Sequence, residues 1–324
     1  MIATIINKAI IQGIPLLFGS TGEIITEKSG NLNLGIPGIM YVGGCTGVIG
    51  AYLYEHSVET PEAFWCIVIP LLSSILGSFL AALIYSFLTI TLRANQNVTG
   101  LALTTFGVGF GDFFGGSLTK IVADGGTLSV KTTADFYKTT LPFADKLGAV
   151  GEMFFNYGFL AYLAVIIALA AAYILKHTRV GLHLRAVGEN PATADAAGIN
   201  VTKYKYIATC VGGIIAGLGG LYFIMDYTGG SWTNGGFGDR GWLAIALVIF
   251  ALWKPNIGII GSFVFGGLYI AYSYIDGLSR SAVAIFNMLP YLVTILVLIL
   301  ASVRRKKENQ PPQSLGLPYF REER

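Results

Sequence analysis

The sequence predicts an all-α protein, a polytopic bundle of membrane-spanning helices. Of its 324 residues, 54% are hydrophobic and only 12% are charged, whereas soluble domains carry about 25% charged residues. Several uncharged apolar stretches reach the roughly 20 residues that a helix needs to cross a bilayer. The sequence lacks the ten-residue alternation of a membrane β-barrel. These observations exclude a soluble domain and place the chain in a membrane.

Apolar runs follow one another along most of the chain and predict about eight or nine crossings, some short or broken. The 42 glycines predict close helix packing, because small residues let helix backbones approach each other in lipid. The first run contains Lys8 and lacks a small-residue cleavage site, so it is expected to stay as a span and not a signal peptide. The runs lie near residues 2–20, 34–53, 64–92, 98–118, 154–175, 206–227, 241–253, 257–275 and 281–303.

Basic residues predict the orientation of the chain in the membrane. The basic residues 304–307 follow the last run, so residues 1–303 are expected to form the transmembrane domain and residues 304–324 a cytoplasmic tail with a flexible end. Counting back from that tail, the basic segment 176–205 is expected in the cytoplasm and the loop 119–153 outside. The net charge of +3 therefore reflects topology, and no nucleic-acid partner is implied.

Two Gly-rich polar segments, 23–40 and 229–246, each precede an apolar helix. Non-helical backbone at membrane depth is tolerated only where protein or a watery cavity satisfies its polar groups. Both segments are therefore expected to be broken or half helices. The predicted topology places them on opposite sides, as an inverted repeat would.

The segment 176–199 is a polar, basic island between two apolar runs. Ala194 and Gly198 are four residues apart, which predicts that both lie on one face of a short helix where a partner could approach the backbone closely. The alternative is an amphipathic helix lying on the membrane surface. Arg185 and Glu189 are also four apart and could simply pair with each other.

Polar and aromatic side chains inside Gly-rich spans are candidates for a solute pathway. Asn31 and Asn33 precede a helix that contains Pro37, and their amides either bind a polar solute or cap the helix. In segment 94–116, aromatic rings could stack on a nucleobase and hydroxyls could bond a ribose, or the rings could simply face lipid. Asp239 and Arg240 are expected to pair locally. The pathway candidates are Asn31, Asn33, Thr104, Thr105, Phe106, Phe110 and Trp242.

Three segments carry a resemblance to a known family. Residues 22–23 and 27–40 closely resemble the first-helix signature of permeases of ABC importers, within the simple-sugar and nucleoside branch related to ribose and branched-chain amino-acid permeases. Residues 181–199 are similar to the coupling region of that branch, and residues 240–246 to its second-half signature. The three segments occur in the family's order.

One position departs from the pattern of these permeases. The coupling loop of ABC importers commonly reads Glu-Ala-Ala-x-x-x-Gly, whereas Ala192 stands here in place of the Glu, followed by Thr193, Ala194 and Gly198. Glu189, three residues upstream, is the candidate to replace that carboxylate. The resemblance thus predicts the ATPase-coupling residues Arg185, Glu189, Asn190, Ala194 and Gly198, and the structural glycines Gly30, Gly35 and Gly38.

The resemblance implies a permease subunit of an ABC importer in the inner or plasma membrane of a prokaryote. The sequence has no G-x-x-x-x-G-K-[ST], H-E-x-x-H or G-x-S-x-G motif, so ATP hydrolysis is expected in a partner and not in this chain. No cofactor or metal is expected on this chain, because ATP and Mg belong to the ATPase. The implied partners are a cytoplasmic ABC ATPase, a second, non-identical permease, an extracytoplasmic solute-binding protein and membrane lipid.

Three substrate classes and one other mechanism stay open at this point. The aromatic-rich segment 94–116 favours nucleosides, with simple sugars such as ribose or galactose and branched-chain amino acids as rivals. A secondary transporter without an ATPase is the more distant alternative. It would be expected to carry ionisable residues at mid-membrane, and only Asp112 and Asp226 come close.

Overall fold

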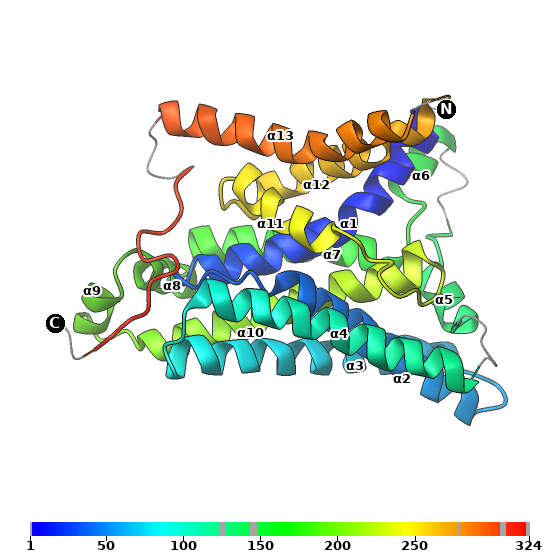
Figure 1. Ribbon diagram of the computed structural model, residues 1–324, viewed down its shortest axis with the longest axis horizontal. Helices are drawn as coiled ribbons and strands as arrows, with labels where there is room; N and C mark the ends of the chain where they lie inside the picture. The colour runs from blue at the N-terminus through cyan, green and yellow to red at the C-terminus, as the bar shows by residue number, and fades with distance from the viewer. Residues whose placement is uncertain are drawn as a thin grey trace.

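The computed structural model describes residues 2–122, 128–142, 148–275, 277, 279–304 and 309–321. Helices make up most of this part of the chain, and its one isolated β-bridge joins Ser129 to Ser231. Figure 1 shows the helices lying side by side in one bundle. They are α1 (Ile2–Glu27), α2 (Ile36–Ser57), α3 (Ala63–Ser86), α4 (Gln96–Val122), α5 (Lys131–Tyr137), α6 (Gly148–Phe154), α7 (Phe159–His177), α8 (Arg179–Glu189), α9 (Pro191–Ala196), α10 (Val201–Tyr222), α11 (Arg240–Phe250), α12 (Pro255–Ile270) and α13 (Arg280–Arg304).

The predicted membrane helix bundle is confirmed. Seven of the described helices are long and apolar enough to cross a membrane, namely α1, α2, α3, α7, α10, α12 and α13. Two further helices, α4 and α11, occupy the remaining predicted runs, and α11 has only 11 residues. Every apolar run in the sequence has therefore become a helix, and the shortest run has become a half-length one.

The centre of the bundle consists of α1, α2 and α10, whose apolar segments are mostly buried within this chain. Glycines permit their close approach, as expected for helices in lipid. A Cβ atom on Gly22 of α1 would lie 2.2 Å from the carbonyl oxygen of Gly212 in α10. A Cβ atom on Gly43 of α2 would lie 2.6 Å from the Cα atom of Gly217. Side chains at these positions would push the three central helices apart.

The two Gly-rich segments interrupt the helices at opposite ends of the bundle. The first break is the turn at residues 28–35, between α1 and α2, and it lies at the end that carries α8, α9 and the C-terminal segment (Figure 1). The second break, residues 228–239, lies at the other end, where Trp232 N donates to the Leu128 oxygen over 3.0 Å. This placement agrees with the predicted topology. The inverted repeat and the membrane side of each end stay predictions.

Two expectations about the connections are wrong in detail. The segment 119–153 is not a plain loop, because α4 continues to Val122 and α5 and α6 follow within it. The described part of the tail, residues 309–321, packs against the bundle instead of forming a free end. The prolines and the glycine of this segment were visible in the sequence, but the surface that it covers was not.

Candidate functional site

Two short helices, α8 and α9, form most of the segment predicted to contact an ATPase. Thr178 begins α8, and its Oγ1 accepts a hydrogen bond from Gly181 N over 3.1 Å. Asn190 ends α8 and begins α9, where its Oδ1 accepts from Thr193 N over 3.0 Å. Pro191 follows at the first helical position, which its fixed φ angle favours. This Asn-Pro pair stops one helix and starts the next, so the chain turns sharply between them.

The predicted pairing of Ala194 and Gly198 on one helical face is wrong. Helix α9 ends at Ala196, and Gly198 lies beyond it with a φ of +83°. Glycine commonly ends a helix in this left-handed conformation because it has no Cβ atom to clash. Ala194 is 3% exposed and packs with Val187 and Val201. Gly198 is exposed and has open space where a Cβ would stand, so only this second residue is accessible to a partner.

Arg185 and Glu189 form no ion pair with each other in the described part of the chain. Arg185 Nε instead donates to the Gly181 oxygen over 3.4 Å, and its side chain is exposed. Glu189 is half-buried and acts on Lys28. Burial lowers the pKa of the Lys28 ammonium, and the carboxylates of Glu189 and Glu27 oppose that shift. The cluster thus joins α8 electrostatically to the turn after α1.

Helix α8 touches the α1–α2 turn backbone to backbone at Gly188. A Cβ atom there would lie 2.3 Å from the Lys28 carbonyl oxygen and 3.2 Å from Gly30 N. The free carbonyl of Gly188 accepts from Ser314 N over 3.0 Å and from Ser314 Oγ over 2.5 Å. Gly30 has a φ of +86°, which lets the turn reverse direction at this contact. A displacement of α8 would therefore act directly on the start of α2.

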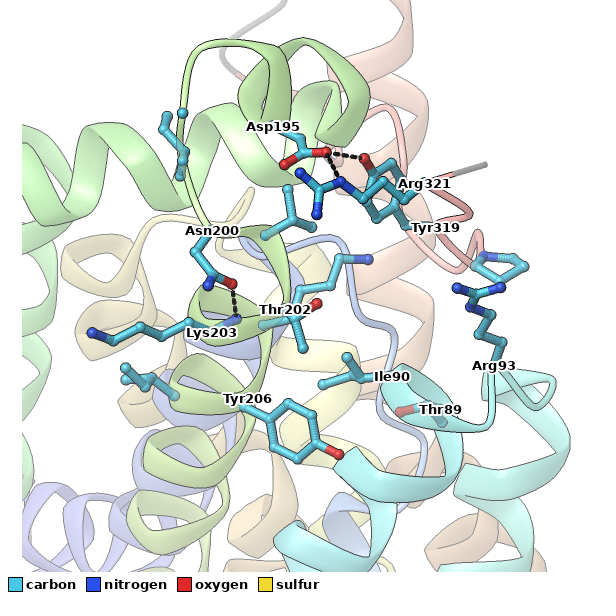
Figure 2. Close-up of a pocket in the computed structure, with 16 residues that line it drawn as sticks. Thr89, Ile90, Arg93, Asp195, Asn200, Thr202, Lys203, Tyr206, Tyr319 and Arg321 are labelled. Carbon is cyan, nitrogen blue, oxygen red and sulfur yellow. Dashed lines mark hydrogen bonds and ion pairs between the residues drawn. The ribbon is translucent and has the colours of Figure 1, made fainter. Parts of the chain in front are cut away.

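The C-terminal segment closes over the same surface, a feature that sequence reasoning missed. Gly316 N donates to the Gly30 oxygen over 3.2 Å. Figure 2 shows Asp195 accepting from the Tyr319 hydroxyl over 2.9 Å and forming an ion pair of 3.1 Å with Arg321. Such contacts between residues more than 100 positions apart leave no periodic signal in a sequence. Together they hold α9 to the tail.

Asn31 and Asn33 lie inside the α1–α2 turn and form hydrogen bonds within the turn and to α1 and α10. Asn31 Nδ2 donates to Thr209 Oγ1 over 3.1 Å. Asn33 Oδ1 accepts from Gly35 N over 2.9 Å, and Asn33 N donates to Glu23 Oε1 over 2.8 Å. Both side chains are almost fully buried. Helix α2 nevertheless starts after Gly35 without a side-chain cap, so the structure does not show these asparagines capping it. Asn31 Oδ1 and Asn33 Nδ2 have no hydrogen-bond partner in the part of the chain described, and solute contact by these amides stays a prediction.

The start of α2 lies between α4 and α11. A Cβ atom on Gly38 would lie 2.5 Å from the Leu103 oxygen of α4, and one on Gly241 of α11 would lie 2.5 Å from the Cα of Pro37. Thr104 Oγ1 donates to the Leu34 oxygen over 2.7 Å. The first turns of two helices, α2 and α11, therefore meet inside the bundle. Discontinuous helices whose N-termini meet near mid-membrane are a recurring way to build a solute site.

Most of the aromatic pathway candidates lie on surfaces that this chain leaves uncovered. Phe106 is 55% exposed and Trp242 is 37% exposed, and Thr105 is also exposed. On α4 the rings of Phe106 and Phe110 are 6.1 Å apart, and those of Phe110 and Phe114 are 4.6 Å apart. Phe110 is half-buried and packs against a core cluster that includes Ile39 and Val42 of α2. The structure therefore presents Phe106, Thr105 and Trp242 outward, to lipid or to another subunit, while Phe110 lies at the edge of the core.

The predicted local pair of Asp239 and Arg240 is absent from the described contacts. Arg240 is 5% exposed and donates to the Phe237 oxygen over 2.9 Å and to Gln12 Oε1 over 3.2 Å. Its guanidinium also lies 4.6 Å from the centre of the Phe223 ring. Neighbouring residues in a helix point in different directions, so adjacency in the sequence did not bring these two charges together. Arg240 instead joins α11 to the helices around it.

Comparisons with known proteins agree with this arrangement. A model of the family described as "Branched-chain amino acid transport system / permease component" matches residues 5–298. The chain is 29% identical to the nucleoside ABC transporter permease protein NupC of Lactococcus lactis, over 91% of each protein. It is 30% identical to the guanosine ABC transporter permease protein NupQ of Bacillus subtilis, over 100% of this chain and 98% of that one. It is 31% identical to TsgC13 of Haloferax volcanii, provisionally named a glucose ABC transporter permease protein, over 99% and 98%.

Proposed function

Because the chain belongs to the family of permease components of branched-chain amino acid transport systems, we propose that it is a membrane subunit of an ABC importer for nucleosides. The observation that carries this proposal is similarity along the whole chain to two permeases named for nucleoside and guanosine transport. Similarity over nine-tenths or more of each protein extends to the helices, the turns and the coupling segment.

The structure supports a route from the ATPase to the solute pathway. An ATPase that binds to α8 and α9 would push on Gly188 and, through it, on the backbone of Lys28. The α1–α2 turn continues into the start of α2, which touches α11 at Gly241. Each step is a backbone contact without an intervening flexible side chain, so the push would be transmitted with little loss. In this mechanism the coupling motion separates or closes the meeting point of α2 and α11.

The coupling residues divide by accessibility. Arg185, Asn190 and Gly198 are exposed and are the candidates for direct contact with the ATPase. Glu189 is half-buried beside Lys28 and would position the turn. Ala194 is buried and would support the shape of the surface from below. Because the Glu of the family pattern is missing, direct contact with the ATPase would fall to the Arg185 guanidinium, the Asn190 amide and the backbone at Gly198.

The pathway itself would form between two permease subunits. Phe106, Thr105 and Trp242 flank the start of α2 on surfaces that one chain leaves exposed. A second permease facing them would enclose a channel with aromatic walls, and aromatic faces stack well on nucleobases. The remaining parts of the system are a solute-binding protein outside and the ATPase inside. The C-terminus, at the same end as α8 and α9, would then be cytoplasmic.

Uptake measurements test the proposal. Radiolabelled guanosine, adenosine, uridine and ribose are offered to cells with and without this chain, and to cells whose partner ATPase carries an inactive phosphate loop. We expect nucleoside uptake to be lost in both deficient strains. Loss without the chain but persistence without the ATPase would contradict an ABC importer.

Sugar import is the second candidate, and one specific observation favours it. TsgC13, provisionally named for glucose, matches this chain over almost its full length. If this chain imports sugars, cells that lack it should lose sugar uptake and keep nucleoside uptake. Glucose therefore belongs in the same experiment as a fifth labelled solute.

A further inference from the structure

A cavity of about 960 Å³ lies beside α9 at the end of the bundle that carries the tail (Figure 2). Its walls come from three separate segments: residues 89–93 after α3, residues 195–207 around the start of α10, and residues 318–321 of the tail. The volume lies at the upper end of the roughly 300–1,000 Å³ of small-molecule sites. The proposed solute pathway does not use this space, whereas the coupling segment borders it through Asp195 and Gly198.

The lining of the cavity is strongly cationic. Arg93, Lys203, Lys205 and Arg321 contribute positive charges, against the single carboxylate of Asp195. That carboxylate is already bonded to the Tyr319 hydroxyl and to Arg321. Asn200, Val201 and Thr202, at the N-terminus of the 22-residue helix α10, line the same space and add the positive end of a helix dipole. The excess of positive charge calls for an anion.

Lys205 is the independent observation that points to a ligand. Its side chain is only 3% exposed, and among the described residues it has no hydrogen bond and no ion pair. Lys205 Nζ is not one of the fully buried unpartnered atoms, so the ammonium has some accessible surface although the rest of the side chain is covered. A lysine this deeply placed is normally paired. The open side of Lys205 is the cavity that it lines. A negatively charged group in that space would supply the missing partner.

Arg93 supports the same interpretation with its guanidinium. Its backbone has a φ of +57°, a conformation that is uncommon for residues with a side chain and that also occurs at Leu252 and Trp253 in this chain. Its guanidinium lies 4.7 Å from the centre of the Phe320 ring. One wall of the cavity is therefore held by a cation-π contact with the tail. The guanidinium nitrogens that do not face the ring stay available as donors.

We propose that this cavity binds a phosphate ester, with Lys205, Lys203 and Arg93 as the residues that contact the phosphate. A phosphate carries up to two negative charges and several acceptor oxygens, so it matches a surplus of cations better than a single carboxylate does. The phosphate belongs either to the headgroup of a membrane phospholipid or to a soluble phosphate ester such as a nucleotide. Because the walls include the tail and the start of α10, the bound ligand would fasten the tail beside the coupling segment.

The test uses the full chain, delipidated in a maltoside detergent that contains no phosphate. Its thermal unfolding midpoint is measured with adenosine monophosphate or phosphatidylglycerol, and with adenosine or diacylglycerol as matched compounds without phosphate, at constant ionic strength. We expect at least one phosphate compound to raise the midpoint in a saturable manner. A rise with the nucleotide alone identifies a soluble ligand, and a rise with the lipid alone identifies a headgroup.

The variant Lys205→Gln should weaken that binding by about 10- to 100-fold, the loss of one charge-assisted hydrogen bond. The matched control is Lys131→Gln, an exposed lysine of α5 at the opposite end of the bundle, which should bind as the unchanged protein does. If Lys205→Gln does not fold, the exposed Lys203→Gln and native mass spectrometry of the unchanged chain give the same comparison.

Three outcomes would overturn the proposal. The midpoint could respond equally to compounds with and without phosphate. The two lysine variants could bind equally well. The ATPase subunit alone could raise the midpoint, with neither phosphate compound acting, which would make the cavity part of a protein interface. None of these measurements depends on transport, so their failure is distinct from failure of the nucleoside assignment.

Discussion

Substituting Gly188 by alanine should uncouple transport from the ATPase while leaving the chain in the membrane. The added Cβ would lie 2.3 Å from the Lys28 oxygen and 3.0 Å from the Lys28 carbonyl carbon. Ordinary contacts of this kind are 3.4 Å or longer, so α8 must move away from the turn by about 1 Å. The obstructing atoms belong to the backbone and cannot rotate aside. Overpacking of this kind costs roughly 1–3 kcal/mol.

The expected result is a small loss of stability and a large loss of uptake. A fully folded protein should tolerate the stability cost, but the altered spacing breaks the backbone contact through which α8 would move the start of α2. We would measure labelled nucleoside uptake, ATPase co-purification and the thermal unfolding midpoint for the same preparation. The uptake should fall more steeply than the amount of assembled protein.

Gly109→Ala is the matched control for this variant. Gly109 lies within α4, and a Cβ atom there would have nothing within 4 Å. Alanine also favours a helix over glycine by about 1 kcal/mol. This variant should therefore transport as the unchanged protein does. Normal ATP-driven uptake by Gly188→Ala, with the control also normal, would refute the proposed route from α8 to α2.

Three further variants test particular contacts. Asp239→Asn should leave the unfolding midpoint unchanged, because Asp239 forms no ion pair with Arg240 among the described contacts. Arg240→Lys should lower the midpoint, because the buried guanidinium donates to the Phe237 oxygen. If both variants lowered the midpoint equally, the two side chains would have to interact after all. Trp253→Phe removes the indole donor to the buried Glu27 carboxyl and should cost about 1–3 kcal/mol in stability, seen as a lower midpoint. Phe106→Ala should reduce nucleoside uptake without lowering the midpoint, since the ring is 55% exposed; unchanged uptake would assign that ring to lipid contact.

The sequence was sufficient for the bundle because the signals for membrane helices are local. Each apolar run lies within one continuous segment, and lipid forces such a segment to satisfy its backbone hydrogen bonds internally. The two breaks were also predictable, since Gly and Asn clusters before Pro37 and before Arg240 mark the ends of helices. The exact residues at which the helices end were less predictable, since α1 continues through Glu27 before the first break.

The partners of individual polar side chains could not be predicted in the same way. Two roles were predicted for Asn31 and Asn33. Only the fold shows that Asn31 Nδ2 donates to Thr209 Oγ1 and that Asn33 Oδ1 accepts from Gly35 N. The four-residue spacing of Ala194 and Gly198 predicted a shared face only on the condition that the helix continued to the glycine. Spacing rules hold within an element, so they fail where the element ends.

The tail shows the same limit at a larger scale and connects it to function. Its basic residues and prolines predicted a membrane anchor followed by a loose end, because composition does not reveal which surface a segment covers. In the structure Ser314 donates hydrogen bonds to the Gly188 oxygen in the last turn of α8, and Tyr319 and Arg321 hold Asp195 near the end of α9. An ATPase that binds α8 and α9 would therefore meet a surface already braced by the tail. In the proposed mechanism the surface that meets the ATPase would have three connected parts, namely the two helices, the α1–α2 turn and the tail, and a push on any one of them would displace the other two.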